Sequence, residues 1–94
     1  MKAPLKGLKH YSFQEIQNTL RSGFRVSLSP ELDNKFDSYA VAAFHRNFKL
    51  GYLPAGQKII FDLLAQYAPL DTVISGIYTD LIDPQVMVEI SIKI

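Results

Sequence analysis

The sequence of 94 residues contains no cysteine. A disulfide, a thiolate zinc site and a cysteine nucleophile are therefore excluded, which fits a reducing compartment. No apolar run approaches the roughly 18 residues that a membrane-spanning helix needs. The segment Met1–Leu8 also lacks the apolar run of a secretory signal. We therefore expect a cytoplasmic protein without a membrane segment.

The common catalytic and cofactor-binding patterns are missing as well. The two histidines, His10 and His45, have no partners at metal-ligand spacing, and no Gly-x-Ser-x-Gly elbow is present. The segment Gly51–Lys58 invites comparison with a phosphate-binding P-loop, but Gln57 separates its second glycine from the lysine. We expect no catalysis, no cofactor and no metal site, and a hydrolase that uses Asp37 is the remote alternative.

The net charge of +1 hides an uneven distribution along the chain. Residues 1–61 carry nine Lys or Arg against four acids, a charge of +5, and residues 62–94 carry one against five, a charge of −4. Such an asymmetry can mark a face that binds polyanions. The alternative is a mixed surface, because the two halves of one small domain interleave in space.

Length and composition predict one globular domain over residues 1–94, because nearly half of the residues (48%) are apolar. Hydrophobic periodicity predicts an α+β fold that is mainly β, with six strands and two helices. The expected strands are 5–8, 24–29, 39–44, 48–53, 72–78 and 85–94, and the expected helices are 13–21 and a second one from Pro54 to just before Pro69. The order β-α-β-β-β-α-β-β predicts a strongly bent sheet or a partly open barrel of the OB or SH3-like kind.

Local patterns add detail to these elements. Ser12 and Glu15 stand at the positions of a capping box, Asn47 is expected to take the positive φ of a hairpin turn, and Gly51 indicates a bulge or a close approach of another group. The final strand, residues 85–94, alternates throughout and could offer an edge for pairing. The predicted apolar faces are Phe13, Ile16 and Leu20; Ile59, Ile60, Leu63, Leu64 and Tyr67; and Val86, Val88, Ile90, Ile92 and Ile94.

The stretch Glu31–Val41 crowds acids, an amide and aromatic rings into one predicted loop. Binding residues often lie in such loops, because rigid strands hold them. The alternative is a turn whose Asp and Asn side chains cap their own backbone. Aromatic residues in or beside loops are interleaved with lysines: His10, Tyr11, Phe36, Tyr39 and Tyr52 with Lys9, Lys35 and Lys49. Rings beside cations suit base stacking, at about 1–3 kcal/mol per base; the alternative places the tyrosines at the edge of the core.

The same stretch resembles the signature of HIRAN domains. That family has a loop of the form Glu-x-Asn/Asp-Asn-Pro-Tyr-Asp-x-Asn-Ala-Val, then a hairpin, then Gly-Tyr/His-Leu/Ile-Pro before a helix. The matching residues are Glu31, Asp33, Asn34, Asp37, Ala40 and Val41, with Phe36 in place of tyrosine, and then Gly51, Tyr52, Leu53 and Pro54. The opening Gly7–Tyr11 also resembles the family's glycine, basic residue and paired aromatics. The resemblance implies a six-stranded, partly open barrel with two helices.

The resemblance also implies a binding site. HIRAN domains known to bind DNA capture the 3′ end of a single strand, so Phe36 and His10 would flank the terminal base and Asp37 would accept a hydrogen bond from the 3′-hydroxyl. Lys9 would meet a phosphate, and Tyr52 would line the floor. The full set of implied site residues is Lys9, His10, Tyr11, Asn34, Phe36, Asp37 and Tyr52.

We therefore predict a non-catalytic module that captures the 3′ end of single-stranded DNA and works with a helicase or nuclease partner. The alternative is a protein-interaction or structural barrel without a nucleic-acid site. Pro30, where the family has arginine, and Ala55, where it often has a basic residue, motivate this alternative together with the near-neutral charge. The sequence predicts no particular oligomeric state.

Overall fold

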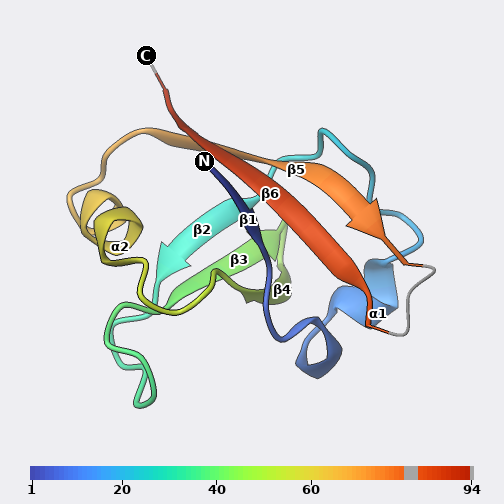
Figure 1. Cartoon of the computed structure of the whole chain (residues 1–94), viewed down its shortest axis with the longest axis horizontal. Coiled ribbons are helices and arrows are strands. Elements are labelled where there is room, and N and C mark those ends of the chain that lie inside the picture. Colours follow the sequence, from blue (N-terminus) through green and yellow to red (C-terminus); the bar gives the residue numbers. More distant parts are fainter. Residues whose placement is uncertain (80–82, 94) are drawn as a thin grey trace.

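The computed structural model describes residues 1–79 and 83–93. Its elements are β1 (Lys2–Pro4), the 3₁₀ turn η1 (Leu8–His10), α1 (Phe13–Ile16), β2 (Ser27–Pro30), β3 (Val41–His45), β4 (Phe48–Tyr52), α2 (Lys58–Ala65), β5 (Leu70–Tyr78) and β6 (Gln85–Ile92). The strands form two antiparallel sheets of three strands each, and α1 and α2 lie at opposite sides of the molecule (Figure 1). The predicted class, mainly β with six strands and two helices, is confirmed, but the first strand lies at Lys2–Pro4 and not at the predicted residues 5–8.

The two sheets, with strand orders β1-β6-β5 and β2-β3-β4, meet at two isolated bridges, Lys6 with Tyr52 and Arg25 with Val73. At the first bridge each backbone N–H donates to the other residue's carbonyl, over 2.7 and 2.9 Å. The contact ends there because Gly7, with a φ of 77°, turns the chain into η1. The described residues thus form two sheets joined at these two bridges and no closed barrel, where the sequence predicted a strongly bent sheet or a partly open barrel.

Gly51 in β4 allows the two sheets to approach closely at the bridge between Lys6 and Tyr52. A Cβ atom at this position would overlap the carbonyl oxygen of Lys6. The pairing of β3 with β4 also shifts register between Ala43 and Phe44, opposite this glycine. The predicted close approach is confirmed, and so is the bulge: Leu50, next to Gly51 in β4, is the extra residue between the pairs Ala43–Gly51 and Phe44–Lys49.

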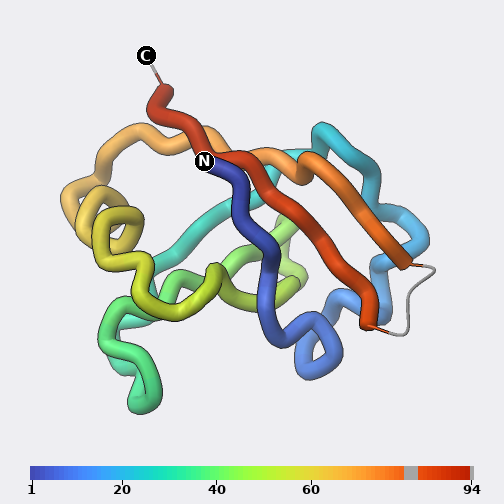
Figure 2. Tube along the Cα trace, in the orientation of Figure 1, coloured from blue at the N-terminus to red at the C-terminus, as the bar shows by residue number. Residues whose placement is uncertain are grey.

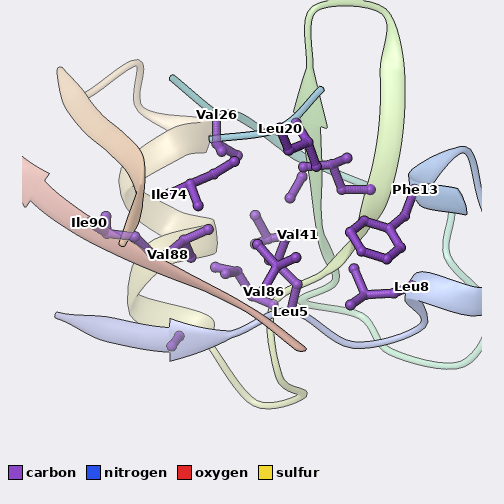
Figure 3. Close-up of a cluster of buried hydrophobic side chains, with 14 of the residues drawn as sticks. Leu5, Leu8, Phe13, Leu20, Val26, Val41, Ile74, Val86, Val88 and Ile90 are labelled. Atoms are coloured by element: carbon purple, nitrogen blue, oxygen red, sulfur yellow. The ribbon is translucent and has the colours of Figure 1, made fainter. Parts of the chain in front are cut away.

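The hydrophobic core lies between the two sheets, where side chains from both point toward one another (Figure 3). Its largest fully buried side chains are Phe13, Leu20, Leu50, Ile74, Val41, Val86 and Val88. The predicted faces formed by Phe13, Ile16 and Leu20 and by Val86, Val88 and Ile90 are buried as expected. Ile92 is 66% exposed instead, because it pairs with Leu70 at the end of the β5–β6 ladder. Ile94 lies outside the described residues.

The first helix is shorter than the predicted range of residues 13–21. It ends at Ile16, where the chain continues as a tighter turn: the Ile16 carbonyl accepts from the Thr19 N–H over 2.9 Å, from the Leu20 N–H over 3.2 Å and from the Thr19 hydroxyl over 2.8 Å. The predicted capping box is wrong as well. Ser12 has helical angles, φ −76° and ψ 0°, without a side-chain capping bond, and its backbone carbonyl accepts from the Glu15 N–H over 3.0 Å.

The second helix begins later than expected and ends as predicted. It starts at Lys58 rather than at Pro54, because Gly56 adopts a φ of 84° that interrupts helical backbone. It ends before Pro69, with Tyr67 in the left-handed region at a φ of 58°. A left-handed residue directly after a helix is the usual way to satisfy its last carbonyls.

The predicted apolar face of α2 is only partly buried. Ile60 is 8% exposed and belongs to the core, whereas Ile59 is 77% and Tyr67 94% exposed. The expectation that both face the core is therefore wrong, because Ile59 points away at the first turn and Tyr67 follows the helix in left-handed backbone. Within the described chain, no helix is long and apolar enough to cross a membrane.

Two further expectations about strands need correction. In the β3–β4 hairpin, His45 pairs with Phe48, and the first loop residue, Arg46, takes the positive φ of 54° instead of Asn47. Two-residue hairpins can place the left-handed conformation at their first position. The strand β6 lies between β1 and β5, so both of its sides are paired and the predicted terminal edge does not exist.

Candidate functional site

The polar stretch forms a loop of residues 31–40 between β2 and β3, hereafter the 31–40 loop. It extends away from the body of the molecule (Figure 2). The Glu31 N–H donates to the Ala40 carbonyl over 2.9 Å and closes the base of the loop. The loop is therefore anchored at its two ends by the strands. Inside it, the Asn34 N–H donates to the Glu31 carbonyl over 3.3 Å and the Ala40 N–H to the Asp37 carbonyl over 3.2 Å, and side chains add further bonds.

Asn34 orders the centre of this loop. Its Oδ1 accepts from the backbone N–H groups of Phe36 and Asp37 over 2.8 and 2.9 Å. Later in the loop, Asp37 Oδ1 accepts from the Tyr39 N–H over 2.9 Å. The interpretation in which Asp and Asn side chains cap their own backbone is thus confirmed, and the loop has a fixed backbone on which Phe36 is mounted.

A cluster of three polar side chains beneath the loop ties it to β4. The Tyr52 hydroxyl lies 2.8 and 2.9 Å from the two carboxylate oxygens of Glu31, and Lys49 Nζ lies 3.3 Å from Glu31 Oε2 and 2.6 Å from the Tyr52 hydroxyl. Asn34 Nδ2 donates to Glu31 Oε1 over 2.9 Å. The ammonium also stands 4.6 and 4.4 Å from the ring centroids of Tyr11 and Tyr52, within cation–π range.

Hydrogen bonds determine the charge state of this cluster. Burial acts to raise the pKa of Glu31, but hydrogen bonds from Asn34, Tyr52 and Lys49 outweigh it and leave that pKa below its usual value. Burial acts to lower the pKa of Lys49, yet its bonds to Tyr52 and Glu31 leave it raised. Burial, aided by the bond to Glu31 and opposed by Lys49, raises the pKa of Tyr52. At neutral pH the cluster is a carboxylate, an ammonium and a neutral phenol.

A pocket of about 660 Å³ opens between this loop and the Lys6 junction of the two sheets. It is lined by Lys6, Tyr11, Glu31, Asp33, Asn34, Lys35, Phe36, Asp37, Ala40, Tyr52, Leu53 and Ala55. Phe36 on its wall is 99% exposed. Tyr11 and Tyr52 meet edge to face, with ring centroids 5.6 Å apart. The pocket therefore combines an open apolar ring with polar groups of both signs.

The structure divides the predicted site residues between two hollows. Tyr11, Asn34, Phe36, Asp37 and Tyr52 line the pocket just described. Lys9 and His10 instead line a neighbouring cavity of about 490 Å³ between η1 and the start of β6, and Lys9 forms an ion pair with Asp83 there. The roles inferred for these two residues stay predictions. Lys6 lines both hollows, so they adjoin at the Lys6 junction.

No known family model matches the chain, and no curated protein matches it either. Solved structures do match. A crystal structure of a protein from Lactobacillus plantarum aligns with a TM-score of 0.78 and 22% identity, over 93% of this chain and 87% of that one. The crystal structure of the HIRAN domain of human HLTF aligns with a TM-score of 0.72 and 14% identity, over 96% of this chain and 71% of that one. The chain has the fold of a HIRAN domain.

At these identities the likeness concerns the fold, so the chemistry of this HIRAN-like domain must be argued from its own residues. Sequence reasoning did not place Glu31, Lys49 or Lys6 in the site, although all three lie at the pocket or in the cluster beneath it. A signal existed for Lys49, which falls between aromatic residues. Among residues 1–79 and 83–93, no three His, Asp or Glu side chains gather as metal ligands would.

Proposed function

We propose that this domain binds single-stranded DNA at a free 3′ end, without catalysis. The observation that carries the proposal is the Phe36 ring, 99% exposed on the wall of a pocket that also contains the Asp37 carboxylate. A ring exposed to this extent contributes nothing to the core. A base stacked on it would recover about 1–3 kcal/mol.

The fixed backbone under Phe36 supports this proposal. Both its N–H and that of Asp37 bond to Asn34 Oδ1, so the ring and the carboxylate are presented from one ordered turn. A preorganised loop pays less conformational entropy on binding than a flexible one. The pocket volume of about 660 Å³ falls in the range of pockets that take small ligands, so a terminal nucleoside is a suitable occupant.

The charges around the pocket favour a strand end over a strand interior. Two cations, Lys6 and Lys35, and two acids outside the Glu31 cluster, Asp33 and Asp37, line it. The acids disfavour a phosphate at the bottom of the pocket, whereas a carboxylate accepts readily from a hydroxyl. With two phosphate contacts, a plot of the logarithm of the binding constant against the logarithm of the salt concentration should have a slope of only about −1.4.

The test compares two oligonucleotides by fluorescence anisotropy at low salt. Both carry a 5′ label and the same short sequence, and one ends in a 3′-hydroxyl, the other in a 3′-phosphate. We expect the hydroxyl end to bind about tenfold tighter or more, because a charge-assisted hydrogen bond is replaced by repulsion. Equal affinities for the two ends, or no binding of either, would overturn the proposal.

Asp37→Asn sharpens the same test. The asparagine oxygen can still accept from the Tyr39 N–H, as Asp37 Oδ1 does over 2.9 Å, so the turn is retained while the charge is lost. Affinity for the hydroxyl end should fall by about 1–3 kcal/mol, and the preference over the phosphate end should shrink. Leu32→Ala is the matched control, because Leu32 lies in the same loop, is 79% exposed and does not line the pocket.

A protein-interaction module is the second candidate, and the exposed apolar residues at α2 favour it. Ile59 and Tyr67 are 77% and 94% exposed. Because β6 lies between β1 and β5, that strand does not offer an edge for association. Under this alternative, the double variant Ile59→Ser/Tyr67→Ser loses binding to a protein partner. Neither the wild type nor the variant binds the oligonucleotide with a 3′-hydroxyl end. Binding of the hydroxyl-ended oligonucleotide by the double serine variant would count against it.

A further inference from the structure

We propose that Glu31 is a positioning residue of this site: oriented by Lys49, it fixes the amide of Asn34, and Asn34 in turn holds Phe36 and Asp37. This inference rests on the proposed function for its effect on DNA binding. It stands by itself as a statement about the order of the 31–40 loop, and the two parts are measured separately below.

The two oxygens of the Glu31 carboxylate face different partners. Oε1 accepts from Asn34 Nδ2 over 2.9 Å, and Oε2 accepts from Lys49 Nζ over 3.3 Å. The Tyr52 hydroxyl lies within 2.9 Å of both oxygens. A rotation of the carboxylate would break several of these bonds at once, so the oxygen that faces the loop is held in place from the β4 side.

The orientation of the Asn34 amide follows from that of Glu31. Because Nδ2 donates to the carboxylate, Oδ1 faces the other way, toward the N–H groups of Phe36 and Asp37. A flipped amide would set an NH₂ group against those two donors and an oxygen against the carboxylate. The two loop N–H groups and the Glu31 carboxylate therefore select the same orientation of the amide, and the carboxylate is the contact that ties it to the cluster beneath the loop.

The burial of the cluster suits this role. The side chains of Lys49 and Glu31 are 26% and 29% exposed, so water competes little for their bond, yet neither charge is buried deeply enough to be neutralised. The ammonium is further confined by the rings of Tyr11 and Tyr52. Lys49 is therefore a rigid cation under the loop, rather than a mobile one available to phosphate.

The positioning role of Glu31 can be tested with a double variant that reverses the direction of the hydrogen bond between residues 31 and 34 and keeps the net charge. Asn34→Asp keeps an acceptor for the Phe36 and Asp37 N–H groups, but its second oxygen then faces the Glu31 carboxylate and repels it. Adding Glu31→Gln supplies an Nε2 donor toward Asp at position 34 and an oxygen toward Lys49. The double variant has the same total charge at positions 31, 34 and 49 as the wild type, with the connecting hydrogen bond reversed.

Three measurements are made on the wild type, both single variants and the double variant: amide hydrogen exchange at Phe36 and Asp37 by NMR, affinity for the 3′-hydroxyl oligonucleotide, and the thermal midpoint. We expect Asn34→Asp to accelerate exchange at these two amides and to weaken affinity about tenfold or more, with a small change in midpoint. The double variant should regain slow exchange and come within about threefold of wild-type affinity. Leu32→Ala should match the wild type throughout.

The outcomes separate this inference from the proposed function. If exchange and affinity in Asn34→Asp equal those of the wild type, or if the double variant is no better than that single variant, Glu31 does not position the loop. If the wild type binds no oligonucleotide, the proposed function fails, and the exchange rates alone decide the role of Glu31. Should the double variant fail to fold, Lys49→Met provides the decisive exchange measurement, because it removes the cation that orients the carboxylate.

Discussion

The 31–40 loop and the core between the sheets are held together by opposite means. In the core, Phe13, Leu50 and Val86 have no exposed surface, and each contributes through packing and removal from water. In the loop, Phe36 is 99% exposed, and the backbone is held by the side-chain oxygens of Asn34 and Asp37. Apolar packing stabilises one region, and polar bonds shape the other.

This difference implies that stability and binding can be changed separately. Core contacts are shared by both sheets, so their loss lowers the free energy of unfolding of the whole domain. Loop contacts join residues that are close in sequence and exposed to solvent, so their loss changes a local equilibrium with little effect on the global one. Variants in the core should therefore lower the free energy of unfolding, and variants in the loop should change DNA affinity or local amide exchange instead.

The largest expected effect comes from Phe13→Ala in the core. The ring has no exposed surface, and its removal leaves a cavity that costs about 3–5 kcal/mol of unfolding free energy. Urea denaturation followed by tyrosine fluorescence measures this loss. Phe36→Ala removes the same atoms from an exposed position and should change stability by less than about 0.5 kcal/mol. Similar losses for the two variants would contradict the distinction between the regions.

Gly51→Ala should have the next largest effect, at the point where the core reaches the pocket. The new Cβ would overlap the Lys6 backbone carbonyl, so the two sheets must separate, at about 2–3 kcal/mol. Gly56→Ala is the control: its Cβ would meet open space, and the strain comes from its φ of 84° alone, about 1–2 kcal/mol. If Gly56→Ala loses more unfolding free energy than Gly51→Ala, the contact between the two sheets at Lys6 yields more easily than the structure indicates.

Phe36→Ala should have its effect on affinity instead. Loss of the stacking ring should weaken binding of the 3′-hydroxyl oligonucleotide by about 1–3 kcal/mol. Anisotropy titration measures this change, and Phe36→Tyr serves as the conservative variant because it keeps the ring. An alanine variant that binds as tightly as the wild type would show that the exposed ring does not contact the ligand.

Several features of the fold could be predicted because they depend on local patterns. Alternation located most of β6, Pro69 marked the end of α2, and Gly51 indicated the close approach of another backbone. The capping of loop N–H groups by Asn34 was also foreseeable, since Asn side chains readily bond to backbone two or three residues on. In each case the deciding interaction lies within a few residues of the sequence or, for Gly51, follows from the absence of a Cβ atom.

Other features depend on contacts that no local pattern contains. The first helix gives way to a tighter turn in which the Ile16 carbonyl accepts from both Thr19 and Leu20, and the exposure of Ile92 follows from where the sheet ends. The Glu31 cluster joins residues that are 18 and 21 positions apart, so its existence depends on how β2 and β4 are placed by β3. The resemblance named five residues that line the pocket, whereas the contacts of Glu31 with Lys49 required the tertiary structure.

The smallest expected effect is a pH dependence that the Glu31 cluster adds to stability. The folded-state pKa of Glu31 lies below its usual value of 4.5, so its contribution is present above that value and is lost as the pH falls through the lower folded-state pKa. Partly exposed ion pairs contribute about 0–1 kcal/mol.

Unfolding free energies at pH 7 and pH 3 for the wild type and Glu31→Gln measure the effect. Their difference at pH 7 should shrink at pH 3, because the stabilising contribution of the carboxylate is lost progressively below the usual pKa of 4.5. A difference that stays constant with pH would mean that Glu31 holds the loop by shape alone, without its charge.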